Sequence, residues 1–427
     1  MAQRLHAAMW KLPLNPRLKD ISDRSGKVLK YVPATHIRDL GLRHLGFPED
    51  VLLIRHEYIS ALEELTSRSS DQARGDGVYV TGHPGIGMAW SLYATVLPHH
   101  HPNPGKSCFL FYVLLVRLSG GQPTALQTSE NTFVVFKVTG AEVHDVSARG
   151  PDAIPPGAWA LSHSTSRPRD TFLGASGLGS WIVQATPPLN LRWHEWDEQC
   201  SMTKYVLDYF SSDELCTLGS VHFLNSKPIC TCSPLLRSKI LNLSVHALQR
   251  HYNIWGPSAR TCIELERGTK DVHDLHLAAR SAASGFISNP KYFASLLNML
   301  DSTRDSHTLF AIRPHHLKRD AVKVEIPNEH LTNLFLRVLS DLDDDDQYKF
   351  GRTMHSDACF FDLNNLMLFT QLIRASLAGR SVPEYLGSVP PEASAPVPLR
   401  IGKPESPALH LCVGLGDMVS TSLSAYD

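Results

Sequence analysis

Short apolar runs alternate with stretches of helical spacing through the middle of the chain. The runs have the length and the boundaries of buried strands, and they predict strands at residues 78–81, 123–127, 132–138, 142–146, 158–162, 180–186 and 205–209. Helical spacing predicts helices at 51–65, 107–118 and 243–299. Thr139-Gly140 is a turn signal, so the strands on either side of it predict a β-hairpin. Strands that alternate with helices indicate a parallel sheet covered on both faces, and we therefore expect an α/β fold.

Composition shifts along the chain suggest where its parts begin and end. We divide it into a mixed N-terminal segment (1–50), the α/β domain (51–215), a helical segment (216–300), an α+β region of unknown role (301–380) and a Pro-rich linker and tail (381–427) that we expect to be disordered. A stretch with two prolines, residues 220–242, follows the helix-start signal at Ser211–Glu214. We interpret this stretch as an insertion into the helical segment.

Two glycine-containing pieces match the two halves of one phosphate-binding motif. Gly82, Gly85 and Gly87 follow the apolar run at 78–81, and Lys106-Ser107 precede the predicted apolar helix. If the 18 residues from 88 to 105 were removed, the chain would match G-x-x-x-x-G-K-[ST] between a strand and a helix. The intact chain does not match the motif, and unrelated turn glycines are the alternative interpretation.

The chemistry of phosphate binding requires these residue types. Glycines allow backbone N–H groups to turn toward phosphate oxygens, and the N-terminus of the following helix adds a partial positive charge. Lys106 would reach the β- and γ-phosphates of ATP, and Ser107 would ligate Mg²⁺. The rejoined motif therefore predicts ATP and Mg²⁺ as ligands.

The segment between the two halves has glycine at both boundaries, Gly87 and Gly105. An intron that began with GT at the second base of codon 87 and ended with AG at the first base of codon 105 would restore a glycine codon on splicing. We interpret residues 88–105 as a retained intron or a recent insertion. Its three consecutive histidines, 99–101, lack the spacing of a metal site.

Several pieces of the chain, taken in order, resemble a known family. GVYVTGHPGIG, KSCFLFYVLLVRL, TFVVFKVTGAEVHD, SWIVQATPPLNLRWHEW and YNIWGPSARTCIEL resemble P-loop proteins of basidiomycete fungi that are related to Crinkler effectors and to trypanosomatid retrotransposon-hot-spot proteins. The resemblance runs from about residue 50 to about residue 265. It implies an AAA/STAND-like ATPase fold, in which a P-loop NTPase-like parallel sheet is flanked by helices. A helical segment and a poorly defined α+β C-terminal region follow.

The resemblance also implies roles for three residues outside the loop. His163 occupies the strand end where the family has an acidic Mg²⁺ ligand (Walker B), and histidine cannot supply the anionic oxygen that Mg²⁺ prefers. The alternative is that His163 is an ordinary surface residue at a strand end. Gln184 lies near the end of the next strand, where it or the neighbouring Thr186 could hydrogen-bond water or phosphate; core packing and turn formation are the alternatives. Arg260 in GPSAR matches an arginine that clamps the phosphates, and a surface ion pair is the alternative.

Charge and composition narrow the possible partners. The net charge is −1 and the pI is near 7.1, so no clear nucleic-acid partner is indicated, although local basic patches stay open. The N-terminus has no apolar core of a signal peptide, and the longest apolar run, Cys108–Val116, is too short to span a membrane. Eight cysteines in so long a chain predict free thiols. We expect a cytoplasmic or nuclear protein with no membrane partner.

Two functions remain in competition. The first is an ATP-binding module, an ATPase if the loop is restored, with a protein partner or a second copy of the chain as its other contact. The second is a catalytically inactive relic or interaction scaffold, which the split loop and His163 favour. An effector with a C-terminal nuclease-like domain is less favoured, because residues 300–427 lack an acidic pair followed by Glu-x-Lys.

Overall fold

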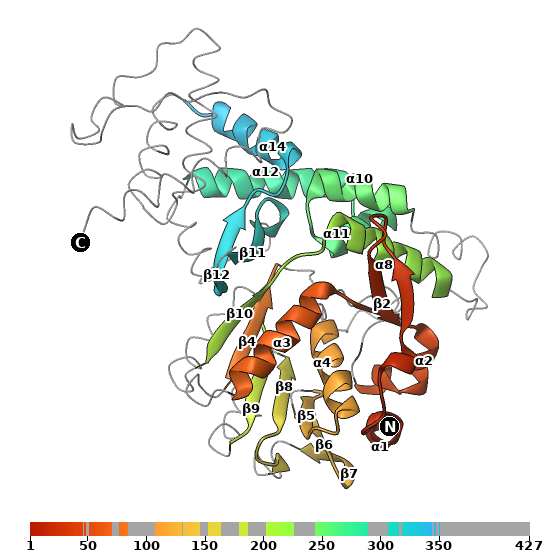
Figure 1. Ribbon diagram of the computed structural model, residues 1–427. Helices are drawn as coiled ribbons and strands as arrows, with labels where there is room; N and C mark the ends of the chain where they lie inside the picture. The colour runs from red at the N-terminus through yellow and green to blue at the C-terminus, as the bar shows by residue number, and fades with distance from the viewer. Residues whose placement is uncertain are drawn as a thin grey trace, which may run out of the picture. The chain divides into compact units, whose positions relative to one another are not determined.

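The computed structural model describes residues 1–45, 47, 51–70, 77–83, 107–129, 131–145, 153–163, 179–186, 202–225, 244–288, 306–315, 318–343, 346 and 350 (Figure 1). The chain divides into two compact units, residues 1–342 and 343–427. Every helix and strand with described bounds lies in the first unit. The segment 88–105 and the Pro-rich tail lie outside the described residues.

A large mixed sheet forms the centre of the first unit. Its strands lie in the order β10 (Thr203–Leu207), β4 (Gly77–Gly82), β9 (Trp181–Ala185), β8 (Trp159–His163), β5 (Thr124–Gln127), β6 (Thr132–Lys137) and β7 (Gly140–Asp145). Neighbouring strands from β10 to β5 are parallel, and β5, β6 and β7 pair antiparallel. The predicted parallel strands and the hairpin around Thr139-Gly140 are confirmed, but the sheet as a whole is mixed because β5, β6 and β7 pair antiparallel.

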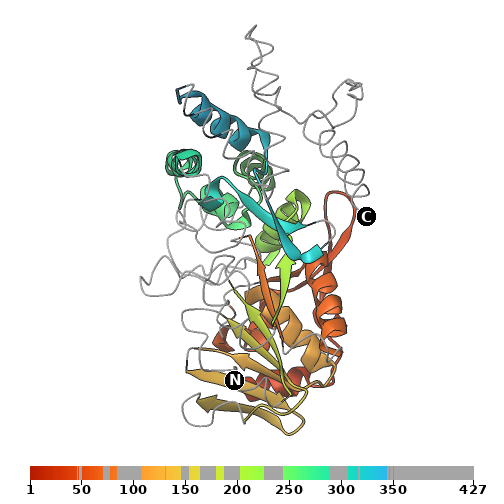
Figure 2. The ribbon, with the colours of Figure 1, turned by 90° about the vertical axis from the view of Figure 1, so that its left-hand side faces the viewer.

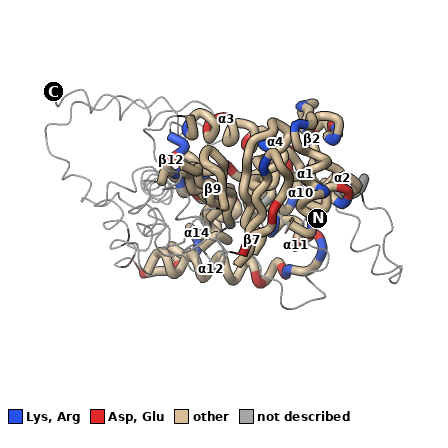
Figure 3. Tube along the Cα trace, turned by 90° about the horizontal axis from the view of Figure 1, so that it is seen from below, with Lys and Arg blue, Asp and Glu red and all other residues tan. Residues whose placement is uncertain are grey.

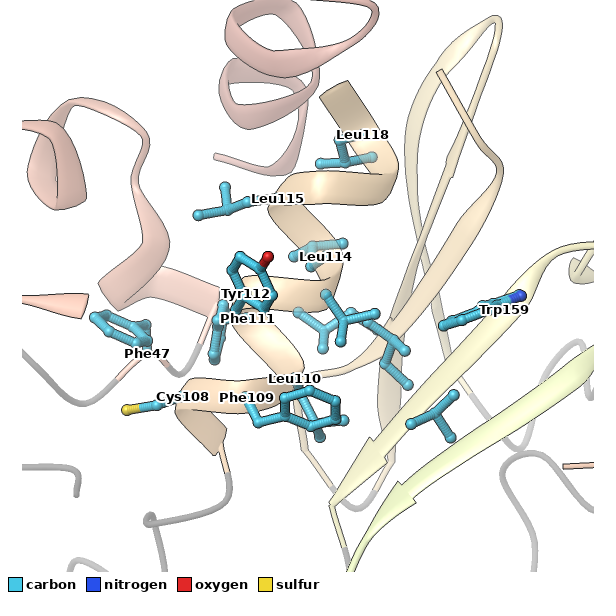
Figure 4. Packing of buried hydrophobic residues seen from close by; sticks show 14 of the residues in the cluster. Phe47, Cys108, Phe109, Leu110, Phe111, Tyr112, Leu114, Leu115, Leu118 and Trp159 are labelled. Carbon is cyan, nitrogen blue, oxygen red and sulfur yellow. The ribbon is translucent and has the colours of Figure 1, made fainter. Parts of the chain in front are cut away.

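Helix α4 (Ser107–Ser119) is buried on all sides. Every residue from Cys108 to Leu115 is at most 8% exposed, because α4 packs between the sheet and the N-terminal elements. The ring of Phe111 meets that of Phe47 with centroids 5.0 Å apart, and Trp159 lies on the sheet side (Figure 4). Continuous burial explains why the sequence of this helix shows no polar face.

Helices α1 (Ala2–Met9) and α3 (His56–Ser70) join α4 in one hydrophobic cluster with the same face of the sheet. Figure 2 shows α3 beside the strands, on one side of the sheet. In the described part of the chain these three helices therefore cover one face. Helices on the opposite face, which the alternation of strands and helices predicts, would fall outside the described residues.

The prediction of a helix over residues 51–65 was wrong at its start. Leu52–Ile54 forms β3, which pairs with β2 (Val28–Val32), and β2 pairs with β1 (Lys19–Ser22), so these strands form a three-stranded antiparallel sheet. Hydrogen bonds to a distant strand outweigh local helical spacing here. The other elements of the N-terminal segment are η1 (Asn15–Arg17), α2 (Ala34–Asp39) and η2 (Leu42–Leu45).

The region after the large sheet is mainly helical, as predicted. It contains α8 (Ser212–Asn225), α10 (Val245–Trp255), α11 (Ala259–Glu266), α12 (Val272–Ser288), η5 (Ser306–Thr308), β11 (Ala311–His315), β12 (Lys318–Glu325) and α14 (Glu329–Ser340). Residues 220–225 of the interpreted insertion continue α8, and the rest of that stretch lies outside the described residues. A second hydrophobic cluster joins α8, α10 and α11 to the small sheet.

Candidate functional site

The carboxyl ends of the parallel strands form one edge of the large sheet. From β4 the chain runs through α4 to β5, which lies beyond β9 and β8, and it later returns to β10 on the other side of β4. The direction of travel across the sheet therefore changes beside β4. In open α/β sheets, ligands bind outside the carboxyl ends of the strands at such a point.

β4 is shaped for close contact with its neighbours. All six of its residues are buried. A side chain at Gly77 would place its Cβ 2.5 Å from the carbonyl oxygen of Ile182 in β9, so only glycine fits there. Gly82 ends the strand with φ of +151°, a value that residues with a side chain rarely adopt. The strand can therefore turn sharply at its carboxyl end.

The predicted loop residues are partly described. Gly82 is the last residue of β4, and Ser107 is the first residue of α4, whose side chain is outside the described part. Gly85, Gly87 and Lys106 also lie outside the described residues. The order strand, connection, helix is confirmed by the strand and helix bounds, whereas the conformation of the phosphate loop stays a prediction.

The other predicted residues lie on different elements. His163 is the last residue of β8, and its side chain is outside the described part. Gln184 in β9 is 2% exposed and pairs with Ser162 in β8 and with Tyr79 in β4, so in the sheet register it lies three residues before Gly82. Arg260 is half-buried near the start of α11, a helix whose apolar face belongs to the second cluster.

Of a row of three buried polar side chains, the sequence analysis identified only Gln184 and missed Gln127 and Ser162. Gln127, Ser162 and Gln184 occupy matching positions on β5, β8 and β9, and the hydroxyl of Ser162 donates a hydrogen bond to the side-chain oxygen of Gln127. These residues alternate with the apolar ones that face α4, so they lie on the opposite face of the sheet. The signal was present as single polar residues near the ends of apolar strands.

Two threonines continue this polar region toward the strand ends. The backbone N–H of Thr186 donates to Val80 O at 3.0 Å, which places Thr186 beside Thr81. Both are at most 2% exposed, and Oγ1 of Thr81 has no hydrogen-bond partner among the atoms that the structure describes. Hydroxyl and amide groups of this kind can bind phosphate oxygens or water.

The C-terminal strands contact the residue that follows β4. The backbone N–H of Ile312 in β11 donates to Nδ1 of His83 at 3.4 Å, so this ring nitrogen carries no proton in that contact. His83 is 2% exposed, and the ring of His307 lies edge-on to it with centroids 6.2 Å apart. The start of the predicted loop is therefore packed against residues more than 200 positions later in the chain.

Ion pairs connect β12 and its neighbours to the end of β10. Arg313 lies 3.1 Å from a carboxylate oxygen of Asp208, and the hydroxyl of Tyr209 donates to Glu325 at 3.0 Å. Burial raises the pKa of Tyr209, and the nearby Glu325 carboxylate adds to this effect. The phenol therefore stays protonated and keeps donating its hydrogen bond.

A second group of charges surrounds β10 from the side of α3. Arg319 pairs with Glu57 at 2.8 Å, and Glu57 also accepts a hydrogen bond from the backbone N–H of Asp208 at 3.0 Å. Burial raises the pKa of Glu57 despite these favourable contacts. Burial also lowers the pKa of Lys204 to about 8. No group of three or more His, Cys, Asp or Glu residues within the described ranges is arranged to hold a metal ion.

Comparisons with known proteins assign this chain to no family. A scan against models of protein families and a search of curated proteins both give no match for this chain. No helix in the described part of the chain is long and apolar enough to cross a membrane. The fold is α/β, with a large mixed sheet flanked by helices.

Proposed function

We propose that this protein is an ATP-binding module of the AAA/STAND-like P-loop class. In this proposal Gly82, Gly85, Gly87, Lys106 and Ser107 form the phosphate loop. The observation that carries it is the position of β4 and α4. An inner parallel strand ends in Gly82 at the point where the chain changes direction across the sheet, and a buried helix begins at Ser107.

The strand order supports this class. If the parallel strands β4, β5, β8, β9 and β10 are numbered one to five, they lie in the order 5-1-4-3-2, which is the order of AAA-like P-loop ATPases. In this order the fourth strand, β9, lies next to the first, and the third strand, β8, lies on the other side of β9. His163 and Gln184 would then stand where that class has its metal-binding and phosphate-facing residues.

The residues present fit a phosphate ligand better than they fit full metal chemistry. Oγ1 of Thr81, buried and without a partner among the described atoms, offers a polar group directly before Gly82. The described ends of β4, β8 and β9 contain no Asp or Glu. Mg²⁺ would therefore depend on Ser107 and on phosphate oxygens, and in an ATPase it would neutralise the charge of the γ-phosphate.

Each proposed side chain has a distinct task. Lys106 would place its positive charge against the β- and γ-phosphates, and the N-terminus of α4 would add its partial charge. Gln184 or Thr186 would orient a water or a phosphate oxygen, since both are neutral hydrogen-bonding groups at the strand end. Arg260 would add a second cation if α11 closes toward the phosphates.

A second candidate is an inactive relic or a scaffold that retains the fold. Two sequence features favour it: the 18 residues between Gly87 and Lys106, and histidine at position 163. The backbone N–H groups of a phosphate loop must be contiguous with the helix start, and an insertion of this length disturbs that continuity although its loop-closure cost is small.

Titration with a fluorescent ATP analogue and Mg²⁺ tests the proposal. The intact chain is compared with a form that lacks residues 88–105, and each is compared with its Lys106→Ala variant. Loss of the charged contacts of Lys106 is expected to weaken binding by about 10- to 100-fold, since hydrogen bonds to charged groups contribute about 1.5–3 kcal/mol. Lys318→Ala, at an exposed lysine of β12, serves as the control and is expected to bind like its parent.

The outcomes separate the candidates. Binding by the shortened form alone, lost with Lys106→Ala, means that the loop exists and that the intact chain is inactivated by its insertion. Equal binding by both forms means that residues 88–105 loop out and that the phosphate loop still forms. If neither form binds while both unfold cooperatively, the phosphate-loop proposal is wrong and the scaffold interpretation stands.

A further inference from the structure

The near-neutral total charge conceals a strong asymmetry along the chain. Residues 1–45 contain nine Lys and Arg against three Asp and no Glu, which is a net charge of +6. The remaining residues contain 32 Lys and Arg against 39 Asp and Glu, which is a net charge of −7. Concentrated positive charge of this kind attracts polyanions even when the whole protein is neutral.

The positive charges of this N-terminal region are not neutralised within the described structure. Seven cationic side chains elsewhere lie within ion-pair distance of carboxylates, namely Arg55, Arg68, Lys137, Arg280, Arg313, Arg319 and Lys323. In residues 1–45, eight cationic side chains form no ion pair with a described carboxylate. They are Arg4, Lys11, Arg17, Lys19, Arg24, Lys27, Lys30 and Arg38. All of these eight except Arg17 are exposed.

The β1–β2 hairpin presents several of these charges together. Its strands pair from Lys19 opposite Tyr31 to Ser22 opposite Val28, whereas β3 pairs only with residues 30–32, so the hairpin end is a two-stranded ribbon. Figure 3 shows Lys and Arg gathered around β2. Arg24 and Lys27 are exposed at the turn.

The acidic residues of the hairpin weaken this charge only in part. The carboxylate of Asp23 accepts hydrogen bonds from the hydroxyl of Ser25 at 2.7 Å and from the backbone N–H of Lys27 at 2.8 Å, so it is engaged in the turn. Asp20 faces Lys30 across the strands. The Asp23 carboxylate also interacts electrostatically with Lys27. Lys19 and Arg24 have no opposite carboxylate, and the hairpin, with four Lys and Arg against two Asp, keeps a positive surface.

We propose that the β1–β2 hairpin, with its neighbouring helices, binds the phosphate backbone of a nucleic acid without reading its sequence. A two-stranded ribbon fits the major groove of a duplex, and unpaired Lys and Arg supply the contacts to phosphates. This surface is separate from the proposed nucleotide site and does not depend on it.

Two other partners fit the hairpin less well. A membrane surface would need an exposed apolar helix face, and the apolar residues of α1 (Ala2, Leu5 and Met9) are buried in the core. A protein partner would need an apolar centre in its interface. The large apolar side chains exposed in residues 1–45 are Met1, Leu12 and Val28, too few for such a centre.

Fluorescence anisotropy with a labelled 20-base-pair DNA duplex tests the proposal on the full chain. If Lys19, Arg24, Lys27 and Lys30 each neutralise one phosphate, log K is expected to fall with log salt at a slope of about −3.6, and affinity to drop about 150-fold from 50 to 200 mM salt. Lys27→Gln with Lys30→Gln is expected to reduce the slope to about −1.8. Lys270→Gln with Lys318→Gln removes the same charge outside the hairpin and is expected to keep the parent slope.

Several results would overturn the proposal. One is that the two double variants weaken DNA binding equally while both keep the parent's unfolding transition. Another is a slope that stays near −3.6 in the hairpin variant. Binding to vesicles of anionic phospholipid, or to poly-glutamate, that matches or exceeds duplex binding at the same salt concentration would show that a different partner occupies this surface.

Discussion

The buried ion pair between Arg55 and Glu214 yields the sharpest stability prediction. Arg55 lies between β3 and α3 with a side chain that is 1% exposed. Its Nε and Nη2 both donate to Oε2 of Glu214 at 3.1 Å, and its remaining N–H groups donate to the backbone oxygens of Asp208 at 3.1 Å and Tyr209 at 2.6 Å. Its guanidinium also lies 4.1 Å from the ring centre of Phe210. One side chain therefore ties the N-terminal sheet to the connection between β10 and α8.

Glu214→Gln is the perturbation that isolates the charge. Glu214 also forms a capping box with Ser211, since Oε2 accepts the Ser211 N–H and the Ser211 hydroxyl accepts the Glu214 N–H, each at 3.1 Å. Glutamine preserves this cap but removes the negative charge. Burial on its own would lower the pKa of Arg55, and the attraction of Glu214 is the main effect that reverses this and raises it. Glu214→Gln thus leaves a buried cation without its counter-charge, which costs about 3–5 kcal/mol.

Urea unfolding followed by circular dichroism measures this cost. Glu214→Gln is expected to lower the free energy of unfolding by about 3–5 kcal/mol, whereas Arg55→Met with Glu214→Gln is expected to recover part of the loss, because no buried charge remains. Glu329→Gln, at an exposed first-turn glutamate of α14, is the matched control and is expected to change stability by less than about 0.5 kcal/mol. A Glu214→Gln cost as small as that of the control would refute the argument that the pair is desolvated and charged.

Three further predictions concern packing, backbone fit and pH. Phe109→Ala is expected to lower the free energy of urea unfolding by about 3–5 kcal/mol, because the ring is fully buried against Tyr58. A decrease below about 1 kcal/mol would contradict this packing. Gly77→Ala is expected to lower the free energy of unfolding by about 1–3 kcal/mol, because the added Cβ would meet the backbone of β9. Gly285→Ala, at a position in open space on α12, is expected to raise it by about 0.5–1 kcal/mol. Similar effects of the two substitutions would exclude the steric explanation. Because the folded state lowers the pKa of Lys204 to about 8, the unfolded chain binds more protons between pH 8 and 10.5. The stability of the parent relative to Lys204→Met is therefore expected to rise across that range by at most about 1.4 kcal/mol per pH unit, and a flat difference would count against the shift.

Local sequence features determined most strands and helices of the large sheet. The apolar run before Gly82 predicted β4, and the apolar stretch after Lys106 predicted α4, because burial on both sides demands continuous apolar side chains. The hairpin of β6 and β7 followed from Thr139-Gly140. The same features placed Gly82 and Ser107 at the two ends of a strand–connection–helix unit. These are properties of residues close together in the chain, so the sequence carries them directly.

The tertiary structure alone decided which strands are neighbours and what lies at their ends. Nothing local indicates that β4 lies between β10 and β9, or that Gln127, Ser162 and Gln184 form one row. Leu52–Ile54 became a strand because β2 supplied its hydrogen bonds. The unpaired charges of the β1–β2 hairpin emerge only when the ion pairs elsewhere are known. Strand pairing and charge neutralisation join residues that are far apart in sequence, and their energies depend on partners that no short window of the chain contains.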